Sequence, residues 1–267
     1  MFDAGSGPPL VIIPGIQGRW EWMQPSVNAL AKEWRVIACS LPGEPGVGRV
    51  RPQPGRHPNR DSDHHHDFDS FVTHVDGVLD AAGVESAVIC GVSFGGLIAL
   101  RYAARRPDRV RALILVSTPG PQWKLKPHLA RYVRWPTISS PIFVLGALRR
   151  YWRELRAIYP DLQAQLNVSA AASWRVAMAP AVPYRMSRRA RLAEGQDFEA
   201  DCAGVTVPTL VVTGERELDQ VVACDETMRY VTLIPGARFQ LFERTGHLGT
   251  LLAPERFAAI VSRFLNG

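Results

Sequence analysis

The stretch Gly91-Val92-Ser93-Phe94-Gly95 joins two apolar segments that predict different secondary structures. Residues 87–90, before it, predict a short buried strand, and residues 96–104, after it, predict a helix that ends before Pro107. A serine on so sharp a turn has an exposed hydroxyl, and small neighbours let the strand and the helix approach each other. The N-terminus of the helix also directs free N–H groups toward that serine. These properties suit a nucleophile whose reaction forms an oxyanion.

Short apolar runs alternate with helical patterns on both sides of this stretch. Strands are predicted at 9–13, 35–39, 87–90, 112–116, 209–212 and 238–242. Helices are predicted at 25–34, 68–82, 96–104 and 254–265. Such alternation is typical of an α/β protein, so we predict a mainly parallel, doubly wound sheet that is covered by helices on both faces.

Two segments interrupt this alternation. Residues 41–67 are rich in Pro, Gly, Arg and His, and they are far longer than a usual connection between a strand and a helix. Residues 120–203 show helical patterns but no convincing strand. We therefore predict that 120–203 form a helical cap, called here the cap segment, inserted into a core made of residues 1–119 and 204–267.

The cap segment is basic and rich in tryptophan. Between residues 119 and 200, 13 Lys or Arg residues stand against 5 Asp or Glu residues. Ser140-Pro141 predicts the start of a helix. The apolar face of this helix is expected to consist of Leu145, Leu148, Trp152 and Leu155. Arginines fall mostly on the opposite side, at positions 149, 150, 153 and 156. We favour a solvated arginine face over an aromatic-anchored core; the alternative is a surface for an anionic substrate, an acidic membrane or an acidic partner.

At this point the chain resembles the α/β-hydrolase-fold superfamily, in its capped, esterase-like serine hydrolase branch. The resemblance covers nearly the whole chain. It is strongest at four motifs, which are Pro14-Gly15-Ile16-Gln17-Gly18, Leu41-Pro42-Gly43-Glu44-Pro45-Gly46, the nucleophile elbow at 91–96, and Thr245-Gly246-His247. The resemblance implies a catalytic triad in the order Ser, acid, His along the chain.

In this family pattern, Ser93 is the nucleophile and His247, which follows the last predicted strand, is the general base. A serine hydroxyl is too weakly acidic to attack at neutral pH without such a base. The acid is Asp219 or Glu217, because the loop holds two residues more than the usual spacing. We favour Asp219; in a third interpretation, both carboxylates are solvated loop residues that partner Arg216.

The resemblance also implies that the backbone N–H groups of Ile16 and Phe94 form the oxyanion hole. Pro14 replaces the histidine that is common in the family, which affects the support of the loop rather than its donors. Ser40 stands where many relatives have Asp. Trp152 is expected to anchor the cap over the mouth of the substrate pocket.

Composition restricts the class of protein. The chain has 267 residues, 46% hydrophobic and 21% charged, which suits one globular α/β domain with an insertion. No segment approaches the ~20 apolar residues that span a bilayer, and the first residues do not resemble a signal peptide. The four cysteines are widely spaced, which predicts free thiols in a reducing, cytoplasmic environment.

The formal net charge of +6 does not indicate a nucleic-acid partner, because the chain has no nucleic-acid-binding motif. No glycine-rich nucleotide motif is present either, so no cofactor is expected. The residues Asp61-Ser62-Asp63-His64-His65-His66-Asp67 suggest metal binding. Three consecutive histidines cannot all face one ion, and a catalytic metal would be redundant with the triad, so we expect no functional metal site.

The sequence thus predicts a serine hydrolase that cleaves a carboxylic ester or similar acyl compound through an acyl-enzyme. Its partner is expected to be a small-molecule acyl substrate that is bulky, apolar or anionic. Two alternatives stay open at this point: the same site used for C–C bond hydrolysis, lactone opening or acyl transfer, and a non-catalytic small-molecule-binding module. The oligomeric state is also open.

Overall fold

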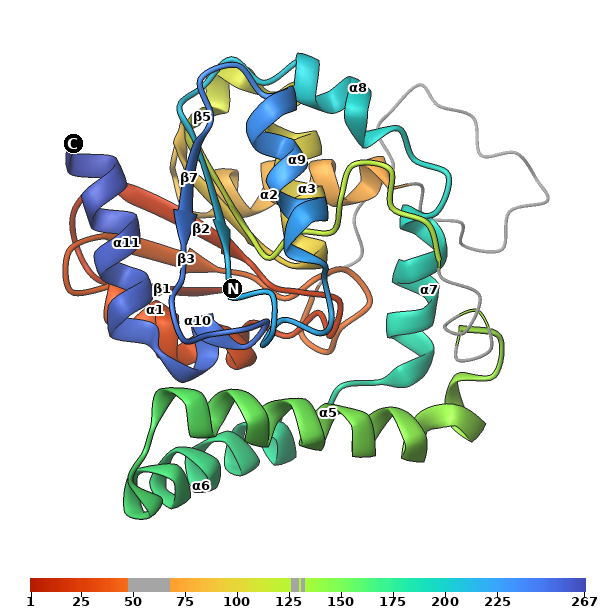
Figure 1. The fold of residues 1–267 in the computed structure, drawn as a ribbon. Helices are drawn as coiled ribbons and strands as arrows, with labels where there is room; N and C mark the ends of the chain where they lie inside the picture. Colours follow the sequence, from red (N-terminus) through yellow and green to blue (C-terminus); the bar gives the residue numbers. More distant parts are fainter. Residues whose placement is uncertain (48–67, 126–129, 131–132) are drawn as a thin grey trace.

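The computed structural model describes residues 1–47, 68–125, 130 and 133–267. The histidines at 64–66 therefore lie outside the described residues. The described strands form one seven-stranded sheet in the order β1-β3-β2-β4-β5-β6-β7 (Figure 1). Their bounds are β1 Phe2–Ala4, β2 Pro9–Ile13, β3 Arg35–Ala38, β4 Ala87–Val92, β5 Val110–Val116, β6 Thr209–Thr213 and β7 Arg238–Leu241.

All strands after β1 run parallel, and β1 pairs antiparallel with β3. The mainly parallel sheet is confirmed. Strand β1 was not predicted, because a strand of three residues carries almost no pattern. Strand β2 ends with Ile13 paired to Gly91 of β4, which places the Pro14–Gly18 loop beside the nucleophile elbow.

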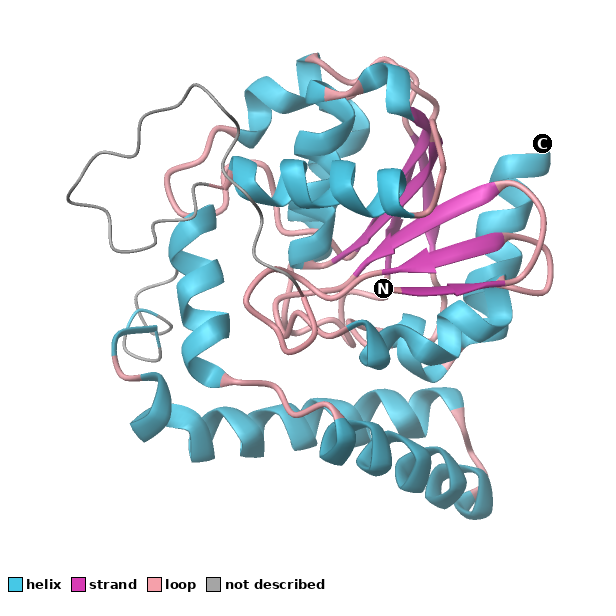
Figure 2. Ribbon diagram, turned by 180° about the vertical axis from the view of Figure 1, so that it is seen from behind, coloured by secondary structure: helices cyan, strands magenta, loops and turns pink. Residues whose placement is uncertain are grey.

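Helices cover both faces of the sheet, as the doubly wound interpretation predicts (Figures 1 and 2). The first face is covered by α2 Asp69–Ala81, α3 Phe94–Arg105, α8 Phe198–Ala203 and α9 Cys224–Leu233. The second face is covered by α1 Gln24–Leu30 and α11 Pro254–Asn266. Short helices complete the core at η1 Trp20–Met23, η2 Pro107–Arg109 and α10 Gly249–Leu252.

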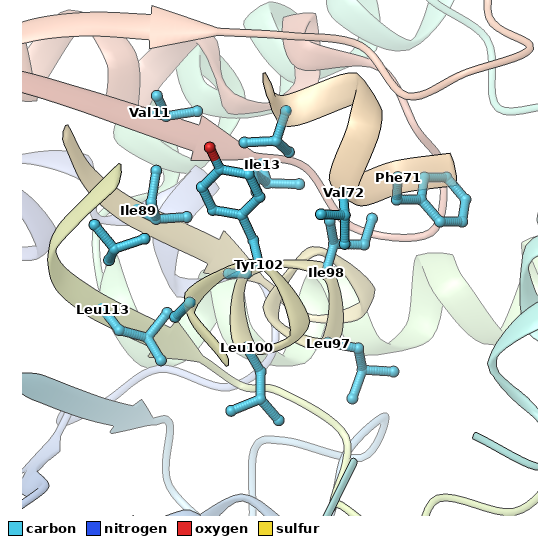
Figure 3. Close-up of a cluster of buried hydrophobic side chains, with 14 of the residues drawn as sticks. Val11, Ile13, Phe71, Val72, Ile89, Leu97, Ile98, Leu100, Tyr102 and Leu113 are labelled. Carbon is cyan, nitrogen blue, oxygen red and sulfur yellow. The ribbon is translucent and has the colours of Figure 1, made fainter. Parts of the chain in front are cut away.

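Helix α3 follows Ser93 directly and is almost entirely buried. Figure 3 shows its side chains Ile98 and Tyr102 among residues of β2, β4 and α2, including Val11, Ile89 and Phe71. Each fully buried side chain of this size contributes roughly 1.5–3 kcal/mol to folding. The helix that begins at Ser93 is therefore held firmly in the core.

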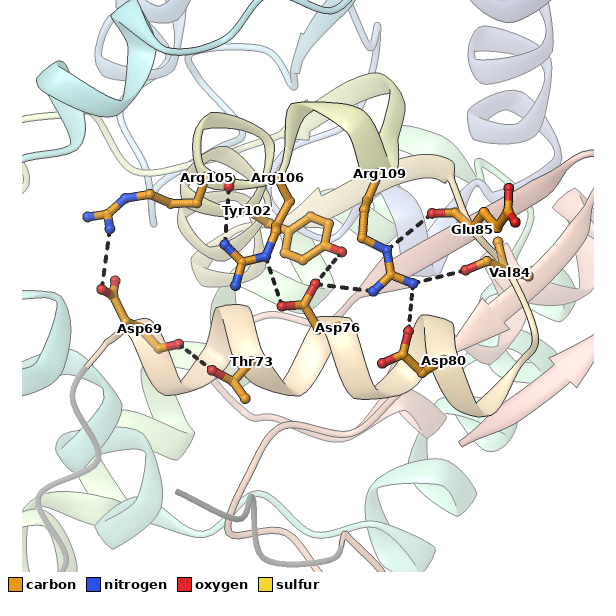
Figure 4. Close-up of polar contacts among 10 residues, drawn as sticks. All are labelled: Asp69, Thr73, Asp76, Asp80, Val84, Glu85, Tyr102, Arg105, Arg106 and Arg109. Atoms are coloured by element: carbon orange, nitrogen blue, oxygen red, sulfur yellow. Dashed lines mark hydrogen bonds and ion pairs between the residues drawn. The ribbon is translucent and has the colours of Figure 1, made fainter. Parts of the chain in front are cut away.

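Polar contacts fix the far end of α3 to α2 (Figure 4). Asp76 of α2 accepts hydrogen bonds from the Tyr102 hydroxyl at 2.9 Å and from Arg106 Nε at 3.0 Å. Arg109 spans Asp76 and Asp80 at 3.4 and 2.7 Å. The element behind the nucleophile elbow is thus anchored by both apolar and ionic contacts.

In the described part of the cap segment, α5 Pro136–Ile158, α6 Leu162–Met178 and α7 Pro183–Ala193 lie beside the core (Figure 1). Helix α7 packs against α5, and α5 contacts α10. Helix α8, which ends at the expected boundary of the cap segment, packs against α3 of the core.

Two predictions for α5 were wrong. The helix begins at Pro136 rather than at Ser140-Pro141, because Pro136 occupies the first turn, where its missing N–H costs nothing. The expected apolar face is also not buried as a unit: Leu145 is 70% exposed, whereas Leu155 is fully buried. The core packs against the side of α5 that carries Glu154 and Leu155.

The described part of the cap segment does not show the aromatic-anchored core that we favoured. Its exposed large apolar side chains include Trp135, Ile138, Leu145, Leu148, Trp152, Leu162, Leu166, Trp174 and Met178. Trp123 alone of the four cap tryptophans packs against the main core cluster. None of the described helices combines the length and the apolar character needed to cross a bilayer.

Candidate active site

Ser93 lies on a strained turn between β4 and α3. Its backbone angles are φ 55° and ψ −122°, a left-handed conformation that is rare for a residue with a side chain. The Ser93 N–H donates to the Val116 carbonyl at 2.8 Å, which ties the turn to β5. A Cβ on Gly91 would collide with the Gly95 carbonyl, and a Cβ on Gly95 would collide with the Ile13 carbonyl. These close approaches require glycine at both ends of the elbow.

His247 and Asp219 lie next to Ser93. The distance from His247 Nε2 to Ser93 Oγ is 3.0 Å, and the distance from His247 Nδ1 to Asp219 Oδ2 is 3.3 Å. The three residues follow β4, β6 and β7, so they come from the carboxyl ends of parallel strands, where open α/β sheets place their ligands. The fold thus brings together three side chains that are far apart in the sequence.

The structure places Asp219, and not Glu217, against the histidine. The Asp219 carboxylate is buried, and its Oδ1 accepts hydrogen bonds from the Val221 and Val222 N–H groups at 3.0 and 2.9 Å. Burial alone would raise the pKa of Asp219, but the charge and hydrogen bond of His247 and the two amides outweigh it and lower that pKa. Glu217 is exposed, and its carbonyl accepts a hydrogen bond from Arg153.

The backbone N–H groups of Ile16 and Phe94 are suited to receive an oxyanion. Both residues line a cavity together with Ser93. Among the described residues, neither N–H donates to a protein acceptor. A Cβ built on Gly15 would lie 3.4 Å from Ser93 Cβ, so the Pro14–Gly18 loop passes directly over the serine.

Ser93 lies between two cavities. The apolar cavity has a volume of about 220 Å³ and is lined by Leu97, Trp123, Val133, Pro136, Met186 and Val222, among others. The second cavity has a volume of about 580 Å³ and is also lined mostly by apolar groups, but it is the more polar of the two and is called here the polar cavity. Its polar residues include Gln17, Arg150, Glu154, Gln220 and His247. Ile16, Ser93, Trp123, Met186 and Val221 line both. A substrate that reacts at Ser93 can therefore extend in two directions of different polarity.

Trp152 is not among the described residues that line either cavity. Its side chain is 36% exposed, and its ring lies edge-on to Tyr151 with centroids 5.9 Å apart. The prediction that Trp152 lies over the pocket is therefore wrong. Helix α5 reaches the polar cavity with Gly146, Ala147, Arg150 and Glu154 instead.

Two buried charged residues of the cap segment contact the catalytic loops, and the sequence interpretation missed both. Glu154 Oε2 accepts hydrogen bonds from the N–H groups of Gly246 and Leu248, each at 2.9 Å. Arg189 Nη1 donates to the Ile16 carbonyl at 2.9 Å, and its Nη2 pairs with Glu44 at 2.7 Å. A weak signal existed for one of them, because Glu154 is the only acidic residue within α5.

The surroundings of Glu154 are unusual for a carboxyl group. Its side chain is 1% exposed, and burial raises its pKa to about 7, although the two amides and His247 oppose this shift. The second oxygen, Oε1, is buried without a partner among the described residues. Among all residues that the structure describes, no group of three or more His, Cys, Asp or Glu side chains is arranged to hold a metal ion.

Comparisons with known proteins agree with this architecture. The family model of the α/β hydrolase fold matches residues 8–254. The chain is 31% identical to a 2-hydroxymuconate semialdehyde hydrolase of a Pseudomonas species, over 99% of this chain and 89% of that protein. It is 27% identical to a 2-hydroxy-6-oxo-2,4-heptadienoate hydrolase of Pseudomonas putida, over 99% of this chain and 91% of that protein.

A solved structure has the same fold at lower identity. The enol-lactonase from Burkholderia xenovorans aligns with a TM-score of 0.75 and 19% identity, covering 100% of this chain and 95% of that one. The fold of this chain therefore recurs in a solved structure.

Proposed function

Because the chain belongs to the α/β-hydrolase-fold family and is a hydrolase, we propose that it cleaves a carboxylic ester or similar acyl compound through an acyl-enzyme. One observation carries this proposal: His247 Nε2 lies 3.0 Å from Ser93 Oγ while Asp219 stands behind the other ring nitrogen. A serine, a base within hydrogen-bond reach and a carboxylate that orients the base are the requirements for nucleophilic catalysis.

In the first half of the reaction, Ser93 Oγ attacks the carbonyl carbon while His247 Nε2 takes its proton. The oxyanion that forms accepts hydrogen bonds from the N–H groups of Ile16 and Phe94, each worth roughly 3–4 kcal/mol in the transition state. His247 then gives the proton to the leaving oxygen, and the bond between this oxygen and the carbonyl carbon breaks. The acyl group remains on Ser93.

In the second half, His247 takes a proton from water, and the hydroxide oxygen attacks the acyl carbon. The bond to Ser93 Oγ breaks, and His247 returns the proton to this oxygen, so the acid leaves and the serine is restored. Throughout, the lowered pKa keeps Asp219 ionised, and the carboxylate holds the Nδ1 proton of His247.

The two cavities suggest how the substrate divides. The leaving group must lie on the side of His247, because this residue protonates it; that side is the polar cavity, which contains Gln17, Arg150 and Gln220. The acyl group then extends past Phe94 into the apolar cavity. In this proposal the cap segment closes both cavities, and the favoured substrate combines an apolar acyl group with a polar leaving group.

The first experiment is labelling with a fluorophosphonate, which reacts with an activated serine. We expect labelling of the wild type and none of the Ser93→Ala variant. Hydrolysis is then compared for two esters of equal size, one with an apolar acyl group and a polar alcohol, and one with these properties exchanged. Faster turnover of the second ester would refute the proposal that the acyl group lies in the apolar cavity and the leaving group in the polar cavity. A wild-type protein that is not labelled would favour a non-catalytic binding module.

A second candidate reaction is C–C bond hydrolysis at the same serine. It is favoured by the names of the two relatives, which are hydrolases of 2-hydroxymuconate semialdehyde and of 2-hydroxy-6-oxo-2,4-heptadienoate. The test compares kcat/KM for 2-hydroxymuconate semialdehyde with that for the better ester. A higher kcat/KM for the semialdehyde would assign C–C bond hydrolysis. Lactone opening is assayed in the same series with a lactone as substrate. Acyl transfer is assayed by adding an alcohol as acceptor to the ester reaction.

We also propose that the protein works in the cytoplasm. Its four cysteines, Cys39, Cys90, Cys202 and Cys224, are all buried and free. Thiols persist in a reducing compartment, whereas disulfides dominate in oxidising ones.

A further inference from the structure

The general base sits on a short loop between β7 and α10, and this loop is held from the cap side. Glu154 Oε2 binds the N–H groups on both sides of His247, those of Gly246 and Leu248, at 2.9 Å each. The contact is tight, because a Cβ on Gly246 would lie 2.7 Å from the Glu154 carboxyl carbon. Asp219 orients the imidazole ring, whereas Glu154 fixes the backbone that carries it.

The oxyanion loop is held in a similar way by another cap helix. Arg189 of α7 is buried and donates to the carbonyls of Ile16 and Pro42 at 2.9 and 3.2 Å. Its ion pair with Glu44 at 2.7 Å keeps the guanidinium in place. Gly18 has φ 80°, and a Cβ there would collide with the guanidinium of Arg189, so the loop is shaped around this side chain.

We propose that Glu154 and Arg189 are positioning residues through which the cap segment sets the geometry of the catalytic loops. Glu154 places His247 in line with Ser93, and Arg189 places the Ile16 N–H in the oxyanion hole. This inference rests on the proposed serine hydrolase function and deepens it, since it makes the cap segment part of the catalytic apparatus. Neither residue needs to touch the substrate for this role.

The two residues differ in how they affect the chemistry. Glu154 has charged or titratable neighbours on three elements: His247 after β7, Asp219 after β6 and Arg150 on α5. The Glu154 carboxyl and the imidazole of His247 interact through their charges, so Glu154 also contributes to the electrostatic surroundings of the base. Arg189 acts on the loop that supplies the Ile16 N–H to the oxyanion hole, and its described contacts do not include His247.

The test measures the rate constant of fluorophosphonate labelling of Ser93 between pH 5 and 9, together with kcat and KM for the better ester. The variants are Glu154→Gln, Glu154→Leu and Arg189→Lys. The matched controls are Glu194→Gln, an exposed glutamate at the end of α7, and Arg191→Lys, an exposed arginine of α7. Circular dichroism and the thermal transition verify that each variant is folded at the assay temperature.

For Glu154→Gln we expect labelling and kcat to fall by roughly 10-fold, and for Glu154→Leu by roughly 100-fold, because small displacements of catalytic groups have effects of this size. KM of Glu154→Gln should stay within about twofold, since glutamine fills the same space in the cavity lining as glutamate. Arg189→Lys should lose roughly 10-fold in labelling and in kcat, and the controls should behave as the wild type.

The isosteric Glu154→Gln variant decides the inference even if Glu154→Leu does not fold. A wild-type rate of labelling and a wild-type kcat in Glu154→Gln would overturn the role of Glu154. A wild-type rate in Arg189→Lys would overturn the role of Arg189. An unlabelled wild type, or a labelled Ser93→Ala variant, would instead refute the proposed function and this inference with it.

Discussion

The core and the cap segment bury their apolar side chains to very different extents. In the core, Leu10, Ile12, Val36 and Ile89 have almost no exposed surface, and each lies on a strand covered by helices. In the cap segment, α5 and α6 leave many large apolar residues exposed, while the buried positions include the charged residues Glu154 and Arg189.

This difference teaches that the two regions are stabilised differently. The core is a continuous apolar cluster on each face of the sheet, and its function is to hold Ser93, Asp219 and His247 in place. The cap segment contacts the core through apolar residues such as Trp123 and Phe198, and also through the buried charged residues Glu154 and Arg189, whose hydrogen bonds end on catalytic loops. Variants in the two regions should therefore differ in the size and in the kind of their effect.

The largest effect is expected in the core. Ser93→Ala removes the nucleophile, so hydrolysis of an activated short-chain ester should fall by on the order of 10⁴- to 10⁶-fold. The thermal transition should hardly change, because the substitution deletes one oxygen at a cavity. Turnover is measured with purified enzyme, and residual activity above about one percent of wild type would refute the nucleophile assignment.

The second effect concerns the acid. Asp219→Asn should reduce kcat by ~10⁴-fold, because an amide at this position favours the wrong tautomer of His247. Glu217→Gln should leave kcat within about twofold, since the Glu217 side chain is exposed. Steady-state kinetics of the two variants side by side decide the question, and a reversed ranking would move the role to Glu217.

Most of the core and its site could be predicted from the sequence, because local sterics determine them. The elbow needs glycine at 91 and 95 wherever a strand turns sharply into a helix, so the pattern itself carries the geometry. The sequence could not decide whether Asp219 or Glu217 is the acid of the triad, because counting residues does not show which carboxylate is buried. Helix α9 was not predicted, since its sequence mixes polar and apolar residues without a clear stripe.

The cap segment could be predicted only in outline. Helical periodicity indicated a helix around 141–156, but the buried face depends on how α5 docks on the core. When α5 docks, the Glu154 carboxylate can be buried because it accepts hydrogen bonds from the N–H groups of Gly246 and Leu248. The position of these two N–H groups depends on the core and cannot be read from the sequence of α5. The same reason explains why Trp152 was assigned to the pocket and Glu154 was overlooked.

The third effect lies at the junction of the two regions. Arg189→Met should lower the free energy of unfolding by roughly 1–3 kcal/mol, because buried Glu44 loses its closest partner but keeps the ion pair with Arg185 at 2.9 Å. Urea denaturation measures this loss. Adding Glu44→Gln to the variant should recover part of it, and an additive loss in the double variant would show that the pair is not coupled.

The fourth effect is a pH dependence of stability that arises from Glu154. Its pKa is raised from the ordinary 4.5 to about 7 by burial, so between these values the folded protein holds a proton that the unfolded chain has released. The stabilisation is complete below about pH 4.5 and is lost as the pH rises toward 7, by up to about 3 kcal/mol. Glu154→Gln has no such titration.

The measurement is urea denaturation of the wild type, Glu154→Gln and the control Glu194→Gln at several pH values between 5 and 8. The wild type and the control should lose stability relative to Glu154→Gln as the pH rises through this window. Parallel curves for all three proteins would show that Glu154 is ionised over the whole range.

The smallest effect is expected on the outer face of α5. Trp152 lines neither cavity in the described part of the chain, and Arg149 and Arg153 are exposed, although Arg153 donates a hydrogen bond to the exposed residue Glu217. Trp152→Ala should therefore leave kcat and KM for small and bulky esters within about twofold, as is usual for exposed positions away from a site. The charge reversals Arg149→Glu with Arg153→Glu should not change neutral-ester kinetics at any salt concentration. Glu154→Gln, two residues from Trp152 but on the inner face, serves as the contrasting variant.

A salt-dependent loss of kcat/KM in the charge-reversal variant would mean that the basic face recruits substrate, since long-range attraction weakens as ions screen it. A raised KM for bulky esters alone in Trp152→Ala would mean that the outer face of α5 closes over the pocket during turnover.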